Sequence, residues 1–141
     1  MLDKTVHSQN KCVLVVDDEP AINQLFAHLL RRNGYEVIQA SNGQEALAQL
    51  AKASRPVSLI ILDVAMPVMD GFEFRAIQRE TPQIAHIPAL VITSRQSFEK
   101  DIRFMKAAAY LKKPIEADLL LETVELHCLS TAPGPLLKNA A

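Results

Sequence analysis

The chain has 141 residues, which is the length of one ordinary domain. Hydrophobic residues make up 49% of it, and 4 glycines and 8 prolines are too few for a collagen-like or low-complexity chain. The 15 basic residues nearly balance the 16 acidic ones, for a formal net charge of −1. This balance, without any basic run, argues against direct binding of nucleic acid.

The sequence shows no targeting or membrane segment. The first ten residues have no apolar core of the kind that signal peptides carry, and no apolar run approaches the ~18 residues of a membrane span. We therefore expect a cytoplasmic protein with no membrane partner. The two cysteines, Cys12 and Cys128, match no metal-binding spacing, and we expect no disulfide.

Apolar runs alternate with helical spacings along the chain. Cys12–Val16 is typical of a strand that is buried on both faces. Pro20 suits the first turn of a helix, and Gly34 is a helix-ending glycine. The other predicted elements are strand 35–38, a helix over 41–53 with a Ser41–Gln44 capping box, strand 57–62, helix 72–80, strand 89–92, helix 97–107, strand 110–112 and a helix to about 129.

This order of elements predicts the fold class. Fully apolar strands that alternate with helices indicate an α/β protein with a five-stranded parallel sheet, doubly wound by five helices. We expect a single domain over residues 11–129, after a polar leader over residues 1–10. Residues 130–141 contain two prolines and a glycine without periodicity, which indicates a tail or the stub of a linker.

Polar residues gather where the predicted strands end. In open parallel sheets the ligand site lies beyond the carboxyl ends of the strands. Singly, an Asp after a strand is more often a helix cap, and Lys-Pro is usually a turn. Together, the polar residues at the strand ends predict three carboxylates, two hydroxyls and one ammonium group at one edge of the sheet. The residues are Asp17 and Asp18 after the first strand, Asp63 after the third, Thr93 and Ser94 after the fourth, and Lys113 after the fifth.

Three carboxylates at one edge favour a cation. Two carboxylates ~4 Å apart repel by about 4 kcal/mol at an effective dielectric constant of about 20, so such a cluster takes up protons or a divalent ion. An all-oxygen ligand set favours a hard ion, and few protein ligands together with a phosphoryl group suit Mg²⁺. The four histidines are scattered along the chain, and we assign none of them a metal role.

Ordered motifs carry a family resemblance over about residues 11–129. They are VLVVDDEP at 13–20, LIILDVAMPVMDG at 59–71, VITS at 91–94 and YLKKP at 110–114. These segments resemble the receiver domain of two-component response regulators. The resemblance implies a flavodoxin-like sheet of strand order 2-1-3-4-5. It also implies a signalling module of a two-component system or phosphorelay, which assists only its own phosphorylation and dephosphorylation.

The resemblance assigns roles to residues at the strand ends. Asp63 is implied to be the phosphoacceptor, supplied by a histidine kinase, a histidine phosphotransfer protein or a small phosphodonor. Asp18 and Asp63 are implied to ligate Mg²⁺ directly, Asp17 through water, and the backbone carbonyl of Ala65 as a further ligand. Lys113 is implied to pair with the phosphoryl oxygens.

The same resemblance implies a switch. Thr93 would turn its hydroxyl to the phosphoryl group and Tyr110 would move inward, changing the surface of helix four, strand five and helix five for a downstream protein target. Without the neighbouring motifs, Tyr110 would be an ordinary half-buried strand aromatic. The peptide bond before Pro114 is typically cis in the family, an isomer that needs proline.

The chain departs from the family between Thr93 and Tyr110. This segment is a couple of residues short, and residues 106–109 lack the usual glycine that permits a left-handed backbone. We expect a shortened helix four or loop, on the surface that receivers use for output or for a homodimer. We also hypothesise that Arg95 shields the phosphoryl group and lengthens its lifetime.

Two other functions fit the sequence less well. A Mg²⁺-dependent phosphatase with an aspartyl nucleophile has a second acid two residues after the nucleophile, where this chain has Ala65. A binding module that never takes up phosphate would be favoured by loss of the key acids or lysine, and all are present. With a receiver over about residues 11–129, the 141 residues leave no room for a DNA-binding or catalytic output domain. Output is therefore expected through protein contacts, unless the Pro-Gly-Pro tail is where a longer protein was cut. The kinase is expected to contact helix one through Asn23, Gln24 and Ala27.

Overall fold

A computed structural model describes residues 11–94 and 102–128. The predicted leader, the tail, Arg95, Leu129 and the first part of predicted helix 97–107 lie outside the described residues. The elements in chain order are β1 (Cys12–Val16), α2 (Pro20–Arg32), β2 (Glu36–Ala40), α3 (Gly43–Lys52), β3 (Leu59–Asp63), α4 (Gly71–Arg79), β4 (Ala89–Thr93), the 3₁₀ helix η2 (Arg103–Met105), β5 (Ala109–Lys112) and α6 (Ala117–His127).

The five strands form one parallel sheet of order β2-β1-β3-β4-β5, which confirms the predicted fold class and strand order. The register pairs Val16 of β1 with Ala40 of β2 and with Leu62 of β3. On the other side, the last residue of β4 pairs with the last residue of β5. The carboxyl ends of all five strands therefore meet at one edge of the sheet.

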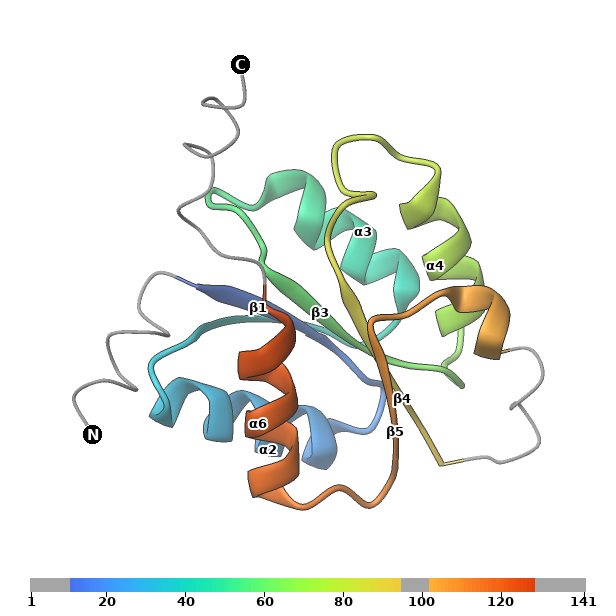
Figure 1. The fold of residues 1–141 in the computed structure, drawn as a ribbon. Helices are drawn as coiled ribbons and strands as arrows, with labels where there is room; N and C mark the ends of the chain where they lie inside the picture. Colours follow the sequence, from blue (N-terminus) through green and yellow to red (C-terminus); the bar gives the residue numbers. More distant parts are fainter. Residues whose placement is uncertain (1–10, 95–101, 129–141) are drawn as a thin grey trace.

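Helices cover both faces of the sheet (Figure 1), with α2 and α6 on one face and α3 and α4 on the other. Alternate residues of each strand enter the two cores, because successive side chains point to opposite faces. Val13 packs on the α2 and α6 side, whereas Leu14 packs on the α3 and α4 side. β1, β3 and β4 are fully buried, as their unbroken apolar sequences predicted. None of the helices in the described part combines the length and hydropathy that a membrane span requires.

The end of α2 confirms the role predicted for Gly34. This glycine has a φ of 91°, in the left-handed region that favours glycine. Its N–H donates to the carbonyl of Arg31, and the N–H of Tyr35 donates to the carbonyl of Leu30. These two bonds make a Schellman motif. Because Tyr35 belongs to this motif, β2 begins at Glu36, one residue later than predicted.

Two helix starts differ from the predicted ones: α3 begins at Gly43 rather than at residue 41, and α4 begins at Gly71 rather than at residue 72. The Ser41–Gln44 capping box is wrong, because Asn42 is the N-cap of α3 and accepts from the N–H of Glu45. The Glu45 side chain reaches back to Ser41 instead. The α4 helix has a complete capping box, since Asp70 and Glu73 each accept from the other's backbone N–H.

The end of predicted helix 97–107 is a short 3₁₀ turn where the structure describes it. Besides the four α-helices and η2, the described residues include Ile102, which is helical and directly precedes η2. Lys106 follows η2 with a φ of 48° and a ψ of 52°, a left-handed backbone on a residue with a Cβ. It occupies the stretch where the sequence lacks the expected glycine, so the left-handed turn is retained without it. β3 also begins at Leu59 rather than at residue 57.

Candidate functional site

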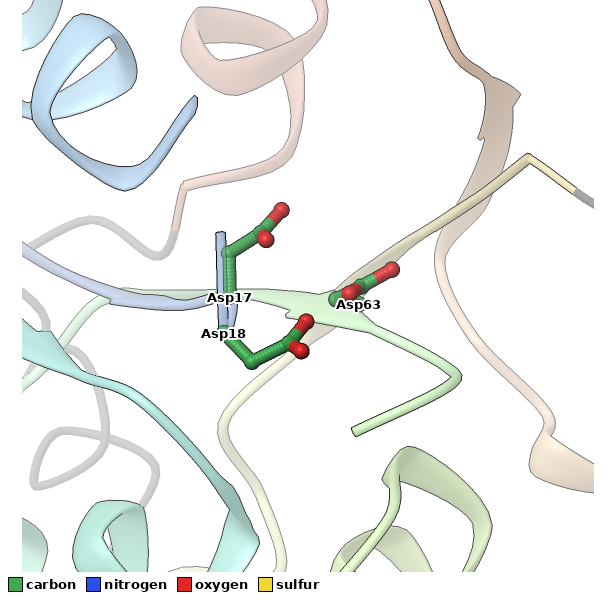
Figure 2. A group of neighbouring side chains, drawn as sticks. All are labelled: Asp17, Asp18 and Asp63. Carbon is green, nitrogen blue, oxygen red and sulfur yellow. The ribbon is translucent and has the colours of Figure 1, made fainter. Parts of the chain in front are cut away.

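The parallel sheet brings the predicted acids together. Asp17 and Asp18 follow β1, and Asp63 is the last residue of β3. One carboxylate oxygen of each lies within 4.8 Å of one oxygen of each of the other two. Figure 2 shows the side chains of Asp17 and Asp18 extending from the end of β1 toward the side on which Asp63 lies. Asp17 and Asp63 are buried, whereas Asp18 is half-buried.

Lys113 joins this group from the end of β5. Its Nζ lies 2.9 Å from Asp17 Oδ2 and 3.6 Å from Asp63 Oδ1. It also donates to Glu19 Oε1 at 3.0 Å, a contact that the sequence did not predict. The backbone N–H of Lys113 donates to the carbonyl of Thr93, which fixes the chain just after the two strands. The Lys113–Pro114 peptide bond is cis, as the resemblance implied.

Burial and mutual repulsion oppose the ionisation of the acids. Burial, followed by the negative charge of Asp17, raises the pKa of Asp63 to about 7. Burial also raises the pKa of Asp17, although its bond to Lys113 works in the opposite direction. Burial disfavours the charged form of Lys113, but the bonds to Asp17 and Glu19 outweigh it and raise the pKa of the ammonium group. One lysine therefore leaves the cluster short of positive charge.

The loop after β3 packs tightly against Asp63. The backbone N–H of Val64 donates to Asp63 Oδ1 at 3.0 Å, and the N–H of Gly71 donates to the carbonyl of Val64 at 2.8 Å. A Cβ on Gly71 would lie 2.4 Å from the carbonyl oxygen of Asp63, so only glycine fits at the start of α4. The loop also contains Val68 with a φ of 68°, a conformation that a β-branched residue rarely adopts.

A depression to which several polar residues contribute lies beside Asp18. It has a volume of about 190 Å³, and Asp17, Gln24, Gln39, Ser41 and Glu45 are among its lining residues. Mg²⁺ binds oxygen ligands and keeps several waters in most protein sites. Three acids that share one lysine, next to open space, fit that ion. The cluster could therefore bind a metal ion.

The switch residues and Ala65 occupy the expected parts of the fold. Thr93 is the last residue of β4 and is buried, with 5% exposure. Tyr110 lies on β5 and is half-exposed; its hydroxyl accepts from the N–H of Ala107 and donates to the carbonyl of Ile102. Ala65 is exposed on the loop after β3. The roles implied for these three residues stay predictions.

Two of the residues expected to contact a kinase are buried. Asn23 is 6% exposed and Ala27 is 0% exposed, so the prediction is wrong for both, whereas Gln24 is exposed. The buried residues of α2 are Asn23, Phe26, Ala27 and Leu30. Their i, i+3, i+4, i+7 spacing was present in the sequence, but a polar residue at its start concealed it.

The ordered motifs and the geometry of the site match one known family. Residues 13–125 match the response regulator receiver domain. The chain is a response regulator receiver domain. It is 34% identical over 119 residues to the polar-differentiation response regulator DivK of Brucella anthropi, which covers 83% of this chain and 95% of DivK.

Solved receivers share the fold. The chemotaxis response regulator CheY4 of Vibrio cholerae is 41% identical with a TM-score of 0.74, over 82% of this chain and 97% of that chain. The response regulator TrrA of Thermotoga maritima, solved in complex with Mg²⁺ and BeF, is 34% identical with a TM-score of 0.72, over 82% of this chain and 97% of that one. The implied family, fold and signalling class are thus confirmed for this receiver.

Proposed function

We propose that Asp63 of this receiver is the phosphoacceptor. The observation that carries the proposal is its place at the end of β3, with a carboxylate oxygen 3.6 Å from Lys113 Nζ and within 4.8 Å of oxygens of Asp17 and Asp18. An Asp63 oxygen forms a bond to phosphorus while the bond from phosphorus to the donor's imidazole nitrogen breaks. The electron pair returns to that nitrogen.

The surrounding residues supply positioning and charge. Phosphoryl transfer depends mostly on positioning and on neutralising the equatorial oxygens, because a carboxylate is a weak nucleophile. We propose that Asp17, Asp18, Asp63 and the Ala65 carbonyl hold Mg²⁺, which when bound supplies positive charge to the phosphoryl oxygens. The complex of TrrA with Mg²⁺ and BeF supports this choice of ion. Lys113 would supply the second positive charge by moving from Asp17 to the phosphoryl group.

We propose that Thr93 and Tyr110 report the phosphorylation. Moving a two-state protein from 1:99 to 99:1 takes about 5.5 kcal/mol, and each hydrogen bond to a charged group contributes about 1.5–3 kcal/mol. New bonds from Thr93 and Lys113 to the phosphoryl group are of that size. Inward movement of Tyr110 would break its bonds to Ile102 and Ala107, altering the surface of η2, β5 and α6.

The partners follow from the family. We propose a histidine kinase or histidine phosphotransfer protein as phosphodonor and a protein as downstream target, with a homodimer as the other form of output. The exposed side of α2, where Gln24 and Leu25 lie, is the proposed kinase contact. A cytoplasmic location fits these partners. Ala65 offers no acid for the phosphatase chemistry weighed above, which favours a signalling role alone.

The experiment is incubation of the whole chain with MgCl₂ and acetyl phosphate, followed by intact mass spectrometry. The wild type and Asp118→Asn, which changes an exposed acid of α6, should gain one phosphoryl group. Asp63→Asn should gain none, and omission of MgCl₂ should abolish the adduct of the wild type. An adduct that survives Asp63→Asn, or none on the wild type, would contradict the proposal.

A further inference from the structure

We propose that Asn23 is a positioning residue for the metal ligands, because its side chain holds the peptide that joins Asp17 to Asp18. This inference rests on the function proposed above, since it concerns how well these acids hold a divalent cation. Asn23 itself would touch neither the ion nor the phosphoryl group. It acts through the main chain of the two ligands that follow β1.

The amide of Asn23 links the ends of two strands. Its Nδ2 donates to the carbonyl of Asp17 at 3.0 Å and to the carbonyl of Ala40 at 2.9 Å. A side-chain amide nitrogen has two hydrogens, and both are used here. The last bond of the β1–β2 ladder, from the N–H of Asp17 to the carbonyl of Ala40, is 3.2 Å long. Asn23 therefore adds hydrogen bonds at the end of the ladder, to the main chain of the first acid and of the last residue of β2.

A second amide fixes the orientation of the first. Gln39 Nε2 donates to Asn23 Oδ1 at 2.7 Å. If the Asn23 amide were reversed, its oxygen would face two carbonyl oxygens and its nitrogen would face a donor. Only one orientation satisfies all three partners. Because Asn23 is 6% exposed, water does not readily replace them.

Asp18 depends on this arrangement more than Asp17 does, because its own side chain has fewer partners. The carboxylate of Asp17 has partners of its own, because it accepts from the N–H of Glu19 at 2.9 Å and lies 2.9 Å from Lys113 Nζ. For the Asp18 side chain, residues 11–94 and 102–128 provide no hydrogen bond. The position of the Asp18 carboxylate therefore depends on the backbone that carries it. Since the peptide unit is planar, a fixed Asp17 carbonyl also fixes the direction in which Asp18 leaves the strand.

The test compares Asn23→Ala with Asn33→Ala by calorimetric titration of the whole chain with MgCl₂. Asn33 lies at the other end of α2, and its side chain donates to the carbonyl of Leu29 at 2.9 Å, so this control also removes a side-chain bond to the main chain. Residues that orient metal ligands typically change metal affinity by about 10–100-fold, and we expect the Kd of Asn23→Ala to rise about tenfold. The Kd of Asn33→Ala should not change, even where its melting temperature falls.

The outcomes separate this inference from the proposed function. If the wild type and a folded Asn23→Ala bind Mg²⁺ equally well, the positioning role is wrong and the proposed function stands. If the wild type does not bind Mg²⁺, both fail. Should Asn23→Ala not fold, Gln39→Ala takes its place, because it leaves Asn23 intact and removes the bond that orients it, together with an exposed 3.4 Å bond from Arg31 to Gln39 Oε1. We expect a smaller weakening of Mg²⁺ binding in Gln39→Ala, and an unchanged Kd would overturn the inference.

Discussion

The ammonium nitrogen of Lys113 lies 2.9 Å from a carboxylate oxygen of Asp17, closer than the 3.6 Å that separates it from Asp63. Before phosphorylation, Lys113 therefore neutralises the charge of Asp17 more than that of Asp63, the proposed nucleophile. It competes with a cation for Asp17. In the proposed reaction a cation that binds Asp17 would release Lys113. The released ammonium group is close enough to Asp63 to pair with the oxygens of the incoming phosphoryl group.

Replacement of Lys113 should lower the stability of the protein and strengthen its binding of Mg²⁺. Breaking a buried ion pair costs about 3–5 kcal/mol, and we expect about 2 kcal/mol for Lys113→Ala because Asp17 can take up a proton. The same variant should bind Mg²⁺ more tightly, since the competing charge is gone. Urea unfolding followed by circular dichroism and titration with MgCl₂ measure the two effects. Unchanged stability together with weaker Mg²⁺ binding would contradict the role given to the lysine.

The raised pKa of Asp63, about 7, predicts a pH dependence of stability. The ordinary Asp value is near 4, so between pH ~4 and ~7 the folded state binds more protons than the unfolded state. The free energy of unfolding should therefore fall as pH rises through this range, by at most about 1.4 kcal/mol per pH unit from this group.

Asp63→Asn is the control for this pH dependence. The variant keeps the size of the side chain and removes the titrating group, so its free energy of unfolding should fall less between pH 4 and 7 than that of the wild type. Excess MgCl₂ should also flatten the wild-type curve, because a bound cation stabilises the ionised acids. Parallel curves for the wild type and Asp63→Asn without Mg²⁺ would show that Asp63 titrates normally.

The left-handed backbone at Lys106 predicts a stabilising substitution. A non-glycine residue in this conformation costs about 1–2 kcal/mol. A glycine removes this cost, but part of the gain is lost because glycine gives the unfolded chain greater freedom. Lys106→Gly should therefore raise the free energy of unfolding by about 0.5–1 kcal/mol. Lys106→Ala removes the same exposed side chain but retains the strain, and it should not stabilise the protein. A loss of stability in Lys106→Gly would contradict the left-handed turn.

A buried arginine secures the same turn. The Arg75 guanidinium donates to the carbonyls of Met105 at 2.8 Å and Lys106 at 2.7 Å, and to Gln78 Oε1 at 2.6 Å. Arg75→Met keeps the apolar stem and should lower the free energy of unfolding by at least about 2 kcal/mol, since it removes three bonds and each bond to a charged group contributes about 1.5–3 kcal/mol.

The neighbouring Arg79 provides the matched control. Its guanidinium makes one exposed bond of 3.3 Å to the carbonyl of Phe104. Arg79→Met should change stability by less than about 0.5 kcal/mol, as most surface substitutions do. Thermal unfolding of both variants measures the difference. Equal losses for the two variants would show that the buried bonds of Arg75 do not hold the turn.

The acids and Lys113 could be predicted from the sequence because strand order alone brings the ends of parallel strands to one edge. Asn23 and Arg75 could not be assigned in this way. Their partners are backbone carbonyls of segments distant in the sequence, Ala40 for the asparagine and Met105 for the arginine. Hydrophobic periodicity carries no signal for a polar side chain that is buried to satisfy such carbonyls.

Chemical location of the phosphoryl group on the chain decides whether Asp63 carries it. After incubation with MgCl₂ and acetyl phosphate, borohydride reduces an aspartyl phosphate to homoserine, which peptide mass spectrometry can place on one residue. We expect homoserine at residue 63 of the wild type and at no other aspartate. Homoserine at another aspartate, or a phosphoryl adduct that yields no homoserine at residue 63, would contradict this expectation.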